Sequence, residues 1–284
     1  MNIFEKMVAL DRRWVFLFLF VVVSFAYFFR NSFSVDVVTT KEVESIYDFI
    51  EGAEPGDKIL MSFDYDPSSL AELHPMSRAI MLHCFRQGVQ VIAVTLSQYG
   101  AGMVEEVLRD VSAEAAELYG REVSYGTDYC FIGYRPYPAF VILGMGENFR
   151  VFFPRDYYDT LLDDLPIMHR VRNYDDVKGV LSITSGTTSD MWIIYGNARY
   201  NMPLALGVTG VMATDYYPYL GNALFGLIGG WKGAAEYEQL VDQPHDANRG
   251  MPAQVAAHLT IVLFIIIGNI GYLMSGRKKP KIGV

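Results

Sequence analysis

The chain has 284 residues, of which 51% are apolar, and its formal net charge is −9 at pH 7. The charge is uneven: without the eight basic and two acidic residues near the ends, residues 31–254 keep 15 basic and 30 acidic side chains, a net charge of −15. This acidity disfavours nucleic acid as a partner and is compatible with cations, a basic protein or simply a well-solvated surface.

The first predicted element is a transmembrane helix over residues 14–30, after a cytoplasmic tail of residues 1–13. Residues 14–29 carry no charge and are flanked by Arg12, Arg13 and Arg30. The run is short for a bilayer, but arginine and aromatic side chains at its ends can sit among the lipid headgroups. A cleavable signal peptide is the alternative, because Ser24-Phe25-Ala26 resembles a cleavage site.

A second transmembrane helix is predicted over residues 255–274, followed by a basic cytoplasmic tail, residues 275–284. Val255 to Leu273 is uncharged, and Arg277, Lys278, Lys279 and Lys281 follow it. Basic flanks are retained on the cytoplasmic side of membranes. The sequence therefore predicts a two-pass protein of the cell membrane, with the bilayer as a partner and residues 31–254 as an extracytoplasmic domain.

Within that domain, apolar strands alternate with helices. Helical spacing is found in 41–50, 75–87, 100–119 and near 190–200, and apolar, strand-like runs are found in 58–63, 89–96, 129–134, 139–143, 177–184 and 204–212. Residues 147–176 read as an aromatic, acidic insertion, 221–241 as an ambiguous segment that ends as a helix, and 242–250 as a linker. The alternation predicts an α/β fold with a mostly parallel, doubly wound (Rossmann-like) sheet.

The two cysteines, Cys84 and Cys130, both fall within apolar patterns. Two buried thiols are the default interpretation, and a single disulfide is the alternative in an oxidising compartment. No cysteine or histidine pair has the spacing of metal ligands.

Candidate site residues are those that end the predicted strands, because ligands of doubly wound sheets bind at the carboxyl ends of the strands. Ser185 to Ser189 precede a helix and could hold an anion, although capping that helix is the simpler role. The polar edge predicted in this way comprises Asp64, Asp66, Thr95, Ser97, Ser185, Thr187, Thr188 and Asp215.

Asp64 and Asp66 form an Asp-x-Asp motif after the first strand, and Thr95 ends a later one. This arrangement resembles the opening motifs of the haloacid dehalogenase-type phosphatases. The resemblance implies that Asp64 is a nucleophile, that Asp66 is an acid/base, that both help hold Mg²⁺, and that Thr95 contacts phosphate. The chain departs from the pattern at Pro67-Ser68-Ser69 and has no clear later lysine or acidic pair. Without the resemblance, the two aspartates read as a turn and a helix cap.

Small residues predict contact surfaces in two places. One comprises Gly226, Gly229, Gly230, Trp231 and Gly233, for which packing on the domain's own sheet is an equal alternative, and the other comprises Gly268, Asn269 and Gly271 in the second membrane helix. An intramembrane Asn usually faces protein rather than lipid.

These features favour a non-enzymatic subunit or scaffold, without a cofactor, which would contact other membrane proteins or a second copy of the chain. A membrane-tethered, metal-dependent phosphatase or other hydrolase that uses Asp64 and Asp66 is the alternative, and only this alternative needs Mg²⁺. An extracytoplasmic solute-binding module that uses the same edge of the sheet is the third.

Overall fold

The computed structural model describes residues 11–30 and 37–274, which form two compact units. Residues 37–248 form the α/β unit, and the described parts of 1–36 and 249–284 form the helical unit. The basic tail at 277–281, which carries much of the predicted membrane topology, lies outside the described residues.

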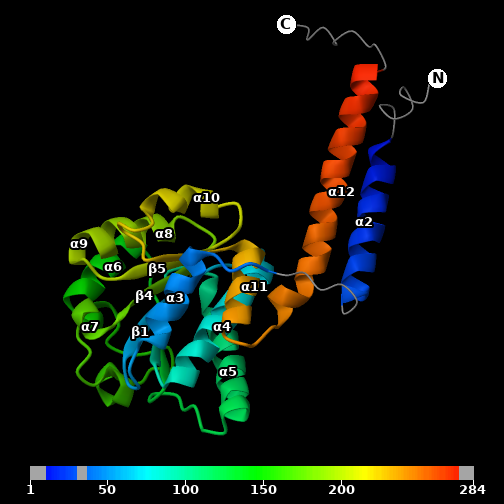
Figure 1. The fold of residues 1–284 in the computed structure, drawn as a ribbon. Coiled ribbons are helices and arrows are strands. Elements are labelled where there is room, and N and C mark those ends of the chain that lie inside the picture. The colour runs from blue at the N-terminus through cyan, green and yellow to red at the C-terminus, as the bar shows by residue number, and fades with distance from the viewer. Residues whose placement is uncertain (1–10, 31–36, 275–284) are drawn as a thin grey trace, which may run out of the picture. The chain divides into compact units, whose positions relative to one another are not determined.

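Six parallel strands form the sheet of the α/β unit (Figure 1). They are β1 (Lys58–Asp64), β2 (Gln90–Thr95), β3 (Tyr129–Tyr134), β4 (Gly179–Thr184), β5 (Leu204–Val208) and β6 (Gly226–Gly229). Their order is β3-β2-β1-β4-β5-β6, so the direction of winding reverses between β1 and β4. The predicted α/β, Rossmann-like fold is confirmed. The strands are almost wholly buried because helices cover both faces of the sheet.

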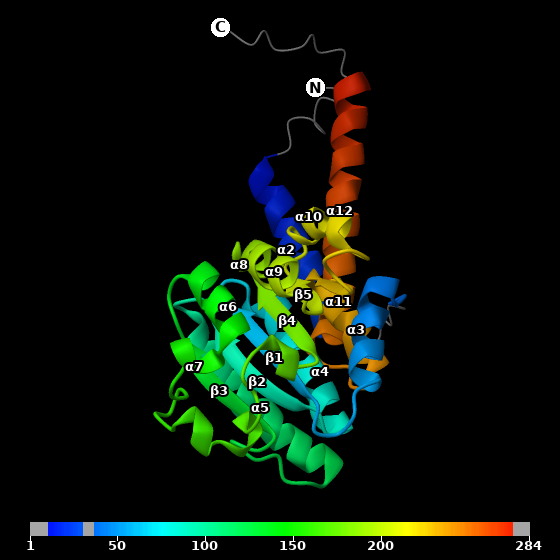
Figure 2. The same cartoon turned by 90° about the vertical axis from the view of Figure 1, so that its left-hand side faces the viewer.

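One face of the sheet carries α3 (Lys41–Glu51), α4 (Leu70–Gln87), α5 (Gly100–Tyr119) and α11 (Gly230–Leu240). The other face carries α6 (Pro138–Glu147), α7 (Phe149–Phe152), α8 (Thr188–Met191), a π-helical segment (Trp192–Asn197) and α9 (Ala198–Tyr200), as Figures 1 and 2 show. Short α10 (Ala213–Tyr216) follows β5. Single 3₁₀ turns occur at Leu162–Asp164, Pro166–Met168, Tyr174–Asp176 and Tyr217–Tyr219.

Local chemistry predicted several elements well. The boundaries of α5 and β3 match the predictions, and Gly88 and Gly120 end α4 and α5 in the left-handed conformation that glycine adopts readily. Cys84 and Cys130 are buried free thiols, as the default interpretation predicts.

Two local predictions are wrong, and one segment that the sequence left ambiguous is resolved. The strand predicted over 139–143 is part of α6, because a short apolar run without alternation fits a buried helix as well as a buried strand. The ambiguous segment 221–241 contains the edge strand β6 as well as α11. The linker predicted over 242–250 ends early, since α12 (Asp246–Met274) has already begun.

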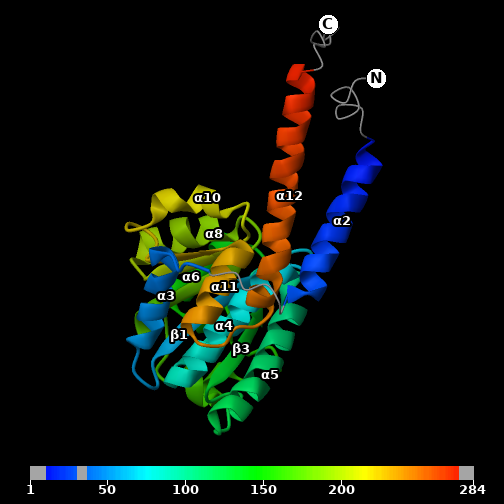
Figure 3. The same ribbon diagram turned by 45° about the vertical axis from the view of Figure 1, so that its right-hand side comes forward.

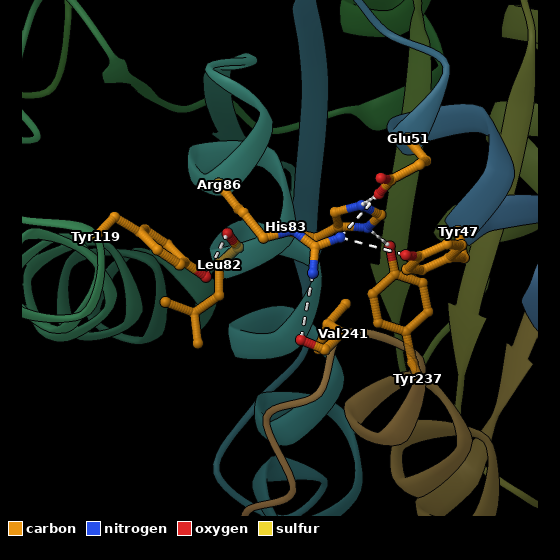
Figure 4. A network of polar contacts seen from close by, with 8 residues as sticks. All are labelled: Tyr47, Glu51, Leu82, His83, Arg86, Tyr119, Tyr237 and Val241. Atoms are coloured by element: carbon orange, nitrogen blue, oxygen red, sulfur yellow. Dashed lines mark hydrogen bonds and ion pairs between the residues drawn. The ribbon is translucent and has the colours of Figure 1, made fainter.

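A polar network joins α3, α4 and α11 on one face of the sheet (Figure 4). The buried His83 ring lies between Tyr237 Oη, 2.8 Å from Nδ1, and Glu51 Oε2, 2.8 Å from Nε2, and it stacks on Tyr47. A carboxylate only accepts hydrogen bonds, so Nε2 carries the proton and Nδ1 accepts from the Tyr237 hydroxyl. Arg86 adds an ion pair to Glu51. Each of the three helices thus contributes a partner to the network.

The helical unit consists of α2 (Arg12–Phe28) and α12, which lie side by side and antiparallel (Figure 3). Phe18 and Phe264 meet edge to face at 5.6 Å, and most apolar side chains of both helices are exposed. Among the described residues, α12 is long and apolar enough to cross a membrane. The 17 residues of α2 span only about 26 Å, less than a typical hydrocarbon core.

The glycines of the first predicted contact surface lie inside the α/β unit. Gly226 lies against Ile46 of α3, Gly229 against Ala213, and Gly230 against Gly210, at distances that leave little or no room for a side chain. Gly233 packs on Ile228, and neighbouring Trp231 is only partly buried. The second predicted surface lies on α12, where Asn269 is exposed, Gly268 faces open space and Gly271 is buried. Its role in association stays a prediction.

Candidate functional site

The candidate site lies where the carboxyl ends of β1, β2 and β4 meet. β1 is paired with β2 on one side and with β4 on the other, and Asp64 at its end pairs in register with Thr184. The strand order reverses between β1 and β4. Ligands of open α/β sheets bind at such switch points, because the flanking loops there turn in opposite directions and leave a crevice.

Asp64 is the buried acid of this site, with a side chain that is 4% exposed. Its carboxylate accepts hydrogen bonds from the Leu96 backbone N–H at 2.6 Å and from the Ser62 hydroxyl at 2.7 Å. Burial raises the pKa of Asp64 from its usual 3.8 to about 6, although these hydrogen bonds and the nearby Trp192 indole lower it in part. A carboxyl group with this pKa exchanges its proton near neutral pH.

Two threonines hold the backbone at the end of β1, one from each neighbouring strand. Thr95 Oγ1 donates to the Phe63 carbonyl at 2.7 Å and accepts from the Ser97 N–H at 3.2 Å. Thr184 Oγ1 likewise donates to the Asp64 carbonyl at 3.2 Å and accepts from the Gly186 N–H. Both side chains are fully buried. The two threonines hold the end of β1 in place. These bonds engage the Thr95 hydroxyl, which the phosphatase resemblance assigns to phosphate.

Gly100→Ala and Gly102→Ala should change stability in opposite directions, although both lie in the first turn of α5. A Cβ at Gly100 would come within 2.1 Å of Thr95 Oγ1 and 2.7 Å of the Phe63 carbonyl, whereas a Cβ at Gly102 meets nothing within 4 Å. We expect Gly100→Ala to cost about 1–3 kcal/mol and Gly102→Ala to add up to about 1 kcal/mol. Chemical unfolding of the purified chain measures both. Equal effects would show that the threonine pair tolerates displacement.

Asp66 has the local role that its sequence context predicts. It is partly exposed, and its Oδ1 accepts from the Ser68 N–H at 2.9 Å and from the Ser68 hydroxyl at 2.6 Å. These bonds lower the pKa of Asp66 and form a turn just before α4. The two aspartates of the motif therefore differ: one is buried with a raised pKa, and the other is a turn residue.

The remaining sequence-predicted residues surround Asp64 unevenly. Ser97 and Ser185 are partly buried and lie just after β2 and β4, the two neighbours of β1; Ser185 is next to its strand and Ser97 is two residues beyond its own. Thr187 precedes α8 without capping it through its side chain, and Thr188 is the first residue of α8. Asp215 lies exposed on α10, beyond β5. The structure thus brings Ser97 and Ser185 to the switch point and leaves Asp215 near another strand.

Sequence reasoning missed Ser62, Thr184 and Trp192. Ser62 lies two residues before Asp64, so it shares a face of β1 with it, and this spacing is a signal that the sequence does contain. Thr184 ends β4 as Thr95 ends β2, and both are followed closely by a serine or glycine. Trp192 lies in the π-helical segment, and only the fold brings it to Asp64.

Mg²⁺, which the phosphatase resemblance implies, does not fit the residues present. Asp64 is turned inward to Ser62 and Leu96, and Asp66 is turned to Ser68. In the described part of the chain, no three His, Cys, Asp or Glu side chains are grouped so that they could hold a metal ion. Mg²⁺ takes six oxygen ligands in an octahedron and is usually held through one or two carboxylates that turn toward it, which neither aspartate does here.

Comparisons with known proteins show similarity only at the level of three-dimensional structure. No family model and no curated protein sequence matches the chain. A trehalose-6-phosphate synthase matches with a TM-score of 0.32 and 11% identity over 82% of this chain. The N-terminal domain of the Candida albicans trehalose-6-phosphate phosphatase matches with a TM-score of 0.32 and 15% identity over 86%. The chain spans about half of each, 48% and 47% respectively.

Neither match supports the leading interpretation of the sequence, a non-enzymatic subunit or scaffold, since the matched chains are named as an enzyme and as part of one. That interpretation depended on the lack of a complete catalytic motif. It treated Asp64 as a turn or cap residue, because the sequence alone does not show that tertiary contacts bury this side chain. Similarity this weak carries no argument about the substrate of the chain.

Proposed function

We propose that the α/β unit is a hydrolase in which Asp64 transfers the proton. The observation that carries this proposal is the buried Asp64 carboxyl at the switch point, with its pKa raised to about 6. Buried ionisable groups with shifted pKa values are concentrated at functional sites, because catalysis needs a group that gains and loses a proton near the working pH. Ser97 and Ser185, at the ends of the flanking strands, are the side chains placed to orient a substrate beside it.

The contacts of Asp64 suit acid–base work. The Leu96 N–H and the Ser62 hydroxyl stabilise the ionised carboxylate, while the surrounding apolar residues favour the protonated acid. The group can therefore gain and lose a proton near neutral pH, which is the property that the proposed acid–base step needs. Asp66 is not assigned a catalytic role, because its oxygens hold the turn before α4.

The test uses the full chain, purified in mild detergent, and measures its hydrolysis of three kinds of probe. They are p-nitrophenyl phosphate, p-nitrophenyl acetate and p-nitrophenyl glycosides, one for each class of bond. The rate on the cleaved probe should depend on an ionisation near pH 6. Asp64→Asn should abolish it, and the matched Asp66→Asn should keep it. The proposal fails if no probe is cleaved, or if Asp64→Asn retains the activity.

We also propose that α2 and α12 both cross the cell membrane, with both ends of the chain in the cytoplasm and the acidic α/β unit outside. Arg12 and Arg13 at the start of α2, the exposed apolar side chains of both helices, and their antiparallel contact through Phe18 and Phe264 support this topology. The enzyme would then act on substrates outside the cytoplasm.

A cysteine placed at exposed Asn222 should react with a membrane-impermeant maleimide on intact cells. The native thiols Cys84 and Cys130 are buried and should contribute little background. A cysteine at Lys279, in the basic tail, is the matched control and should react only after the cells are permeabilised. Labelling of Lys279→Cys on intact cells, or protection of Asn222→Cys, would overturn the topology.

A further inference from the structure

A cavity lies beside the edge strand β3, on the α/β unit. Its volume is about 300 Å³, and it is lined by Glu105, Leu108, Arg109, Tyr125, Tyr129 and Tyr158. The first three come from α5, Tyr125 precedes β3, Tyr129 begins it, and Tyr158 belongs to the insertion that follows α7. The backbone of this insertion bonds to the free edge of β3, where the Tyr157 N–H donates to the Phe131 carbonyl at 2.9 Å.

Three tyrosine rings form the walls of this cavity at nearly right angles. The Tyr125 ring makes an angle of 87° with the Tyr129 ring at 5.4 Å, and an angle of 80° with the Tyr158 ring at 5.1 Å. The face of an aromatic ring carries partial negative charge, whereas its edge is positive. In such edge-to-face pairs the edge of one ring covers part of its neighbour's face, and the ring faces that stay uncovered are the negative surfaces available to a cation.

Hydrogen bonds outside the cavity hold the rings in place. The Tyr125 hydroxyl donates to buried Asp156 at 2.6 Å, and the Tyr129 hydroxyl bonds to Ser112 at 3.2 Å. Asp156 also accepts from the backbone N–H of Tyr158 at 2.9 Å, which fixes the turn that presents this tyrosine. Because these partners occupy the polar groups of Tyr125 and Tyr129, their rings are left to line the cavity.

The charge at the cavity favours a cation. Glu105 lines the cavity. Burial raises the pKa of the Tyr158 phenol, and the nearby Glu105 carboxylate raises it further. The opposing charge, Arg109, is largely exposed and is paired with Asp110 at 2.9 Å. The whole domain is acidic, with a net charge of −15 over residues 31–254, so its field raises the local concentration of cations.

We infer that this cavity binds a small organic cation, a quaternary ammonium or methylated amine, against the rings of Tyr125, Tyr129 and Tyr158. A methylated ammonium has a diffuse charge and an apolar surface, so aromatic faces satisfy it while a single carboxylate completes its neutralisation. A hard metal ion would need several oxygen ligands, of which the lining offers one carboxylate. The site lies beside β3 rather than at the β1–β4 switch point, so it does not depend on the proposed hydrolase.

The test is a calorimetric titration of the full chain in mild detergent with choline, and with 3,3-dimethyl-1-butanol, its uncharged analogue of the same shape. Choline should bind at least about fivefold more tightly than the alcohol, because only the cation gains from the ring faces and Glu105. Equal affinity for the two compounds, or no binding of choline, would overturn the inference.

Variants of Tyr158 test whether its ring contributes to binding without a change in the fold. Tyr158→Leu should weaken choline binding at least about fivefold, while Tyr158→Phe, which keeps the ring, should retain it. Tyr158 is 52% exposed, so neither change should unfold the chain. Tyr99→Leu removes a similarly exposed tyrosine elsewhere and should leave the affinity unchanged. Unaltered binding by Tyr158→Leu, or an equal loss in Tyr99→Leu, would contradict the assignment.

Discussion

Asp64→Asn should make the chain more stable and at the same time inactive. The rise in the pKa of Asp64 from 3.8 to about 6 means that keeping this carboxylate ionised in the folded chain costs about 3 kcal/mol at pH 7. An asparagine carries no charge, and its amide can still accept from the Leu96 N–H and donate to Ser62 Oγ. We therefore expect the variant to unfold about 6–12 °C higher at pH 7, with hydrolysis at least about 100-fold slower.

The gain in stability of Asp64→Asn should vanish in acid. This distinguishes an effect of the Asp64 charge from an effect of better packing, which would not depend on pH. A carboxyl whose pKa is raised by folding contributes stability that is present below pH 3.8 and is lost as the pH rises through about 6. The two proteins should therefore unfold at similar temperatures near pH 3.5, since Asp64 is then protonated in both states. Thermal unfolding followed by circular dichroism measures this. A pH-independent difference between them would contradict the assignment of the pKa.

Asp64→Asn should also reveal an acid sensitivity that arises from His83. Burial lowers the pKa of His83 from 6.5 to about 4, even though its hydrogen bond to Glu51 raises it in part. The imidazole thus contributes stability that is complete above pH 6.5 and is lost, by about 3 kcal/mol, as the pH falls to 4. In the native chain Asp64 gains stability over almost the same interval, so the two effects should nearly cancel.

The native chain should accordingly show a nearly flat stability between pH 4 and 6, whereas Asp64→Asn should lose about 3 kcal/mol between pH 6.5 and 4. Adding His83→Gln to Asp64→Asn should flatten the curve again, because glutamine does not titrate. The charged groups around His83 are Glu51 and Arg86, with Tyr47 and Tyr237 as its ring and hydroxyl partners (Figure 4).

Glu51 provides an internal reference for this experiment. Its hydrogen bond from His83 lowers the pKa of Glu51 from 4.5 to about 2, so its contribution is present above pH 4.5 and is lost only below that. Glu51→Gln should therefore act mainly at lower pH than His83→Gln. If Asp64→Asn remained as flat as the native chain from pH 6.5 to 4, the buried, neutral state of His83 would be refuted.

Short-range patterns in the sequence account for most of the secondary structure. The continuous apolar run of β2, the helical spacing of α3 and the glycines that end α4 and α5 are local features, and each predicted its element because it depends on neighbouring residues alone. The failures have a common origin. Residues 139–143 and 226–229 are short and apolar, and whether such a segment is a helix or a strand is decided by the elements that cover it.

The sequence by itself determined the alternation of strands and helices up to β3, the acidic charge of the domain, the two apolar segments, and the position of the polar edge at the ends of the strands. Only the tertiary structure decided which of the two aspartates, Asp64 or Asp66, is buried with a raised pKa. Asp64 and Asp66 are alike in the sequence, but the end of β2 and the π-helical segment bury Asp64, whereas Asp66 faces solvent in a local turn. The pKa of a carboxyl group depends on its desolvation, and residues from distant parts of the chain supply it.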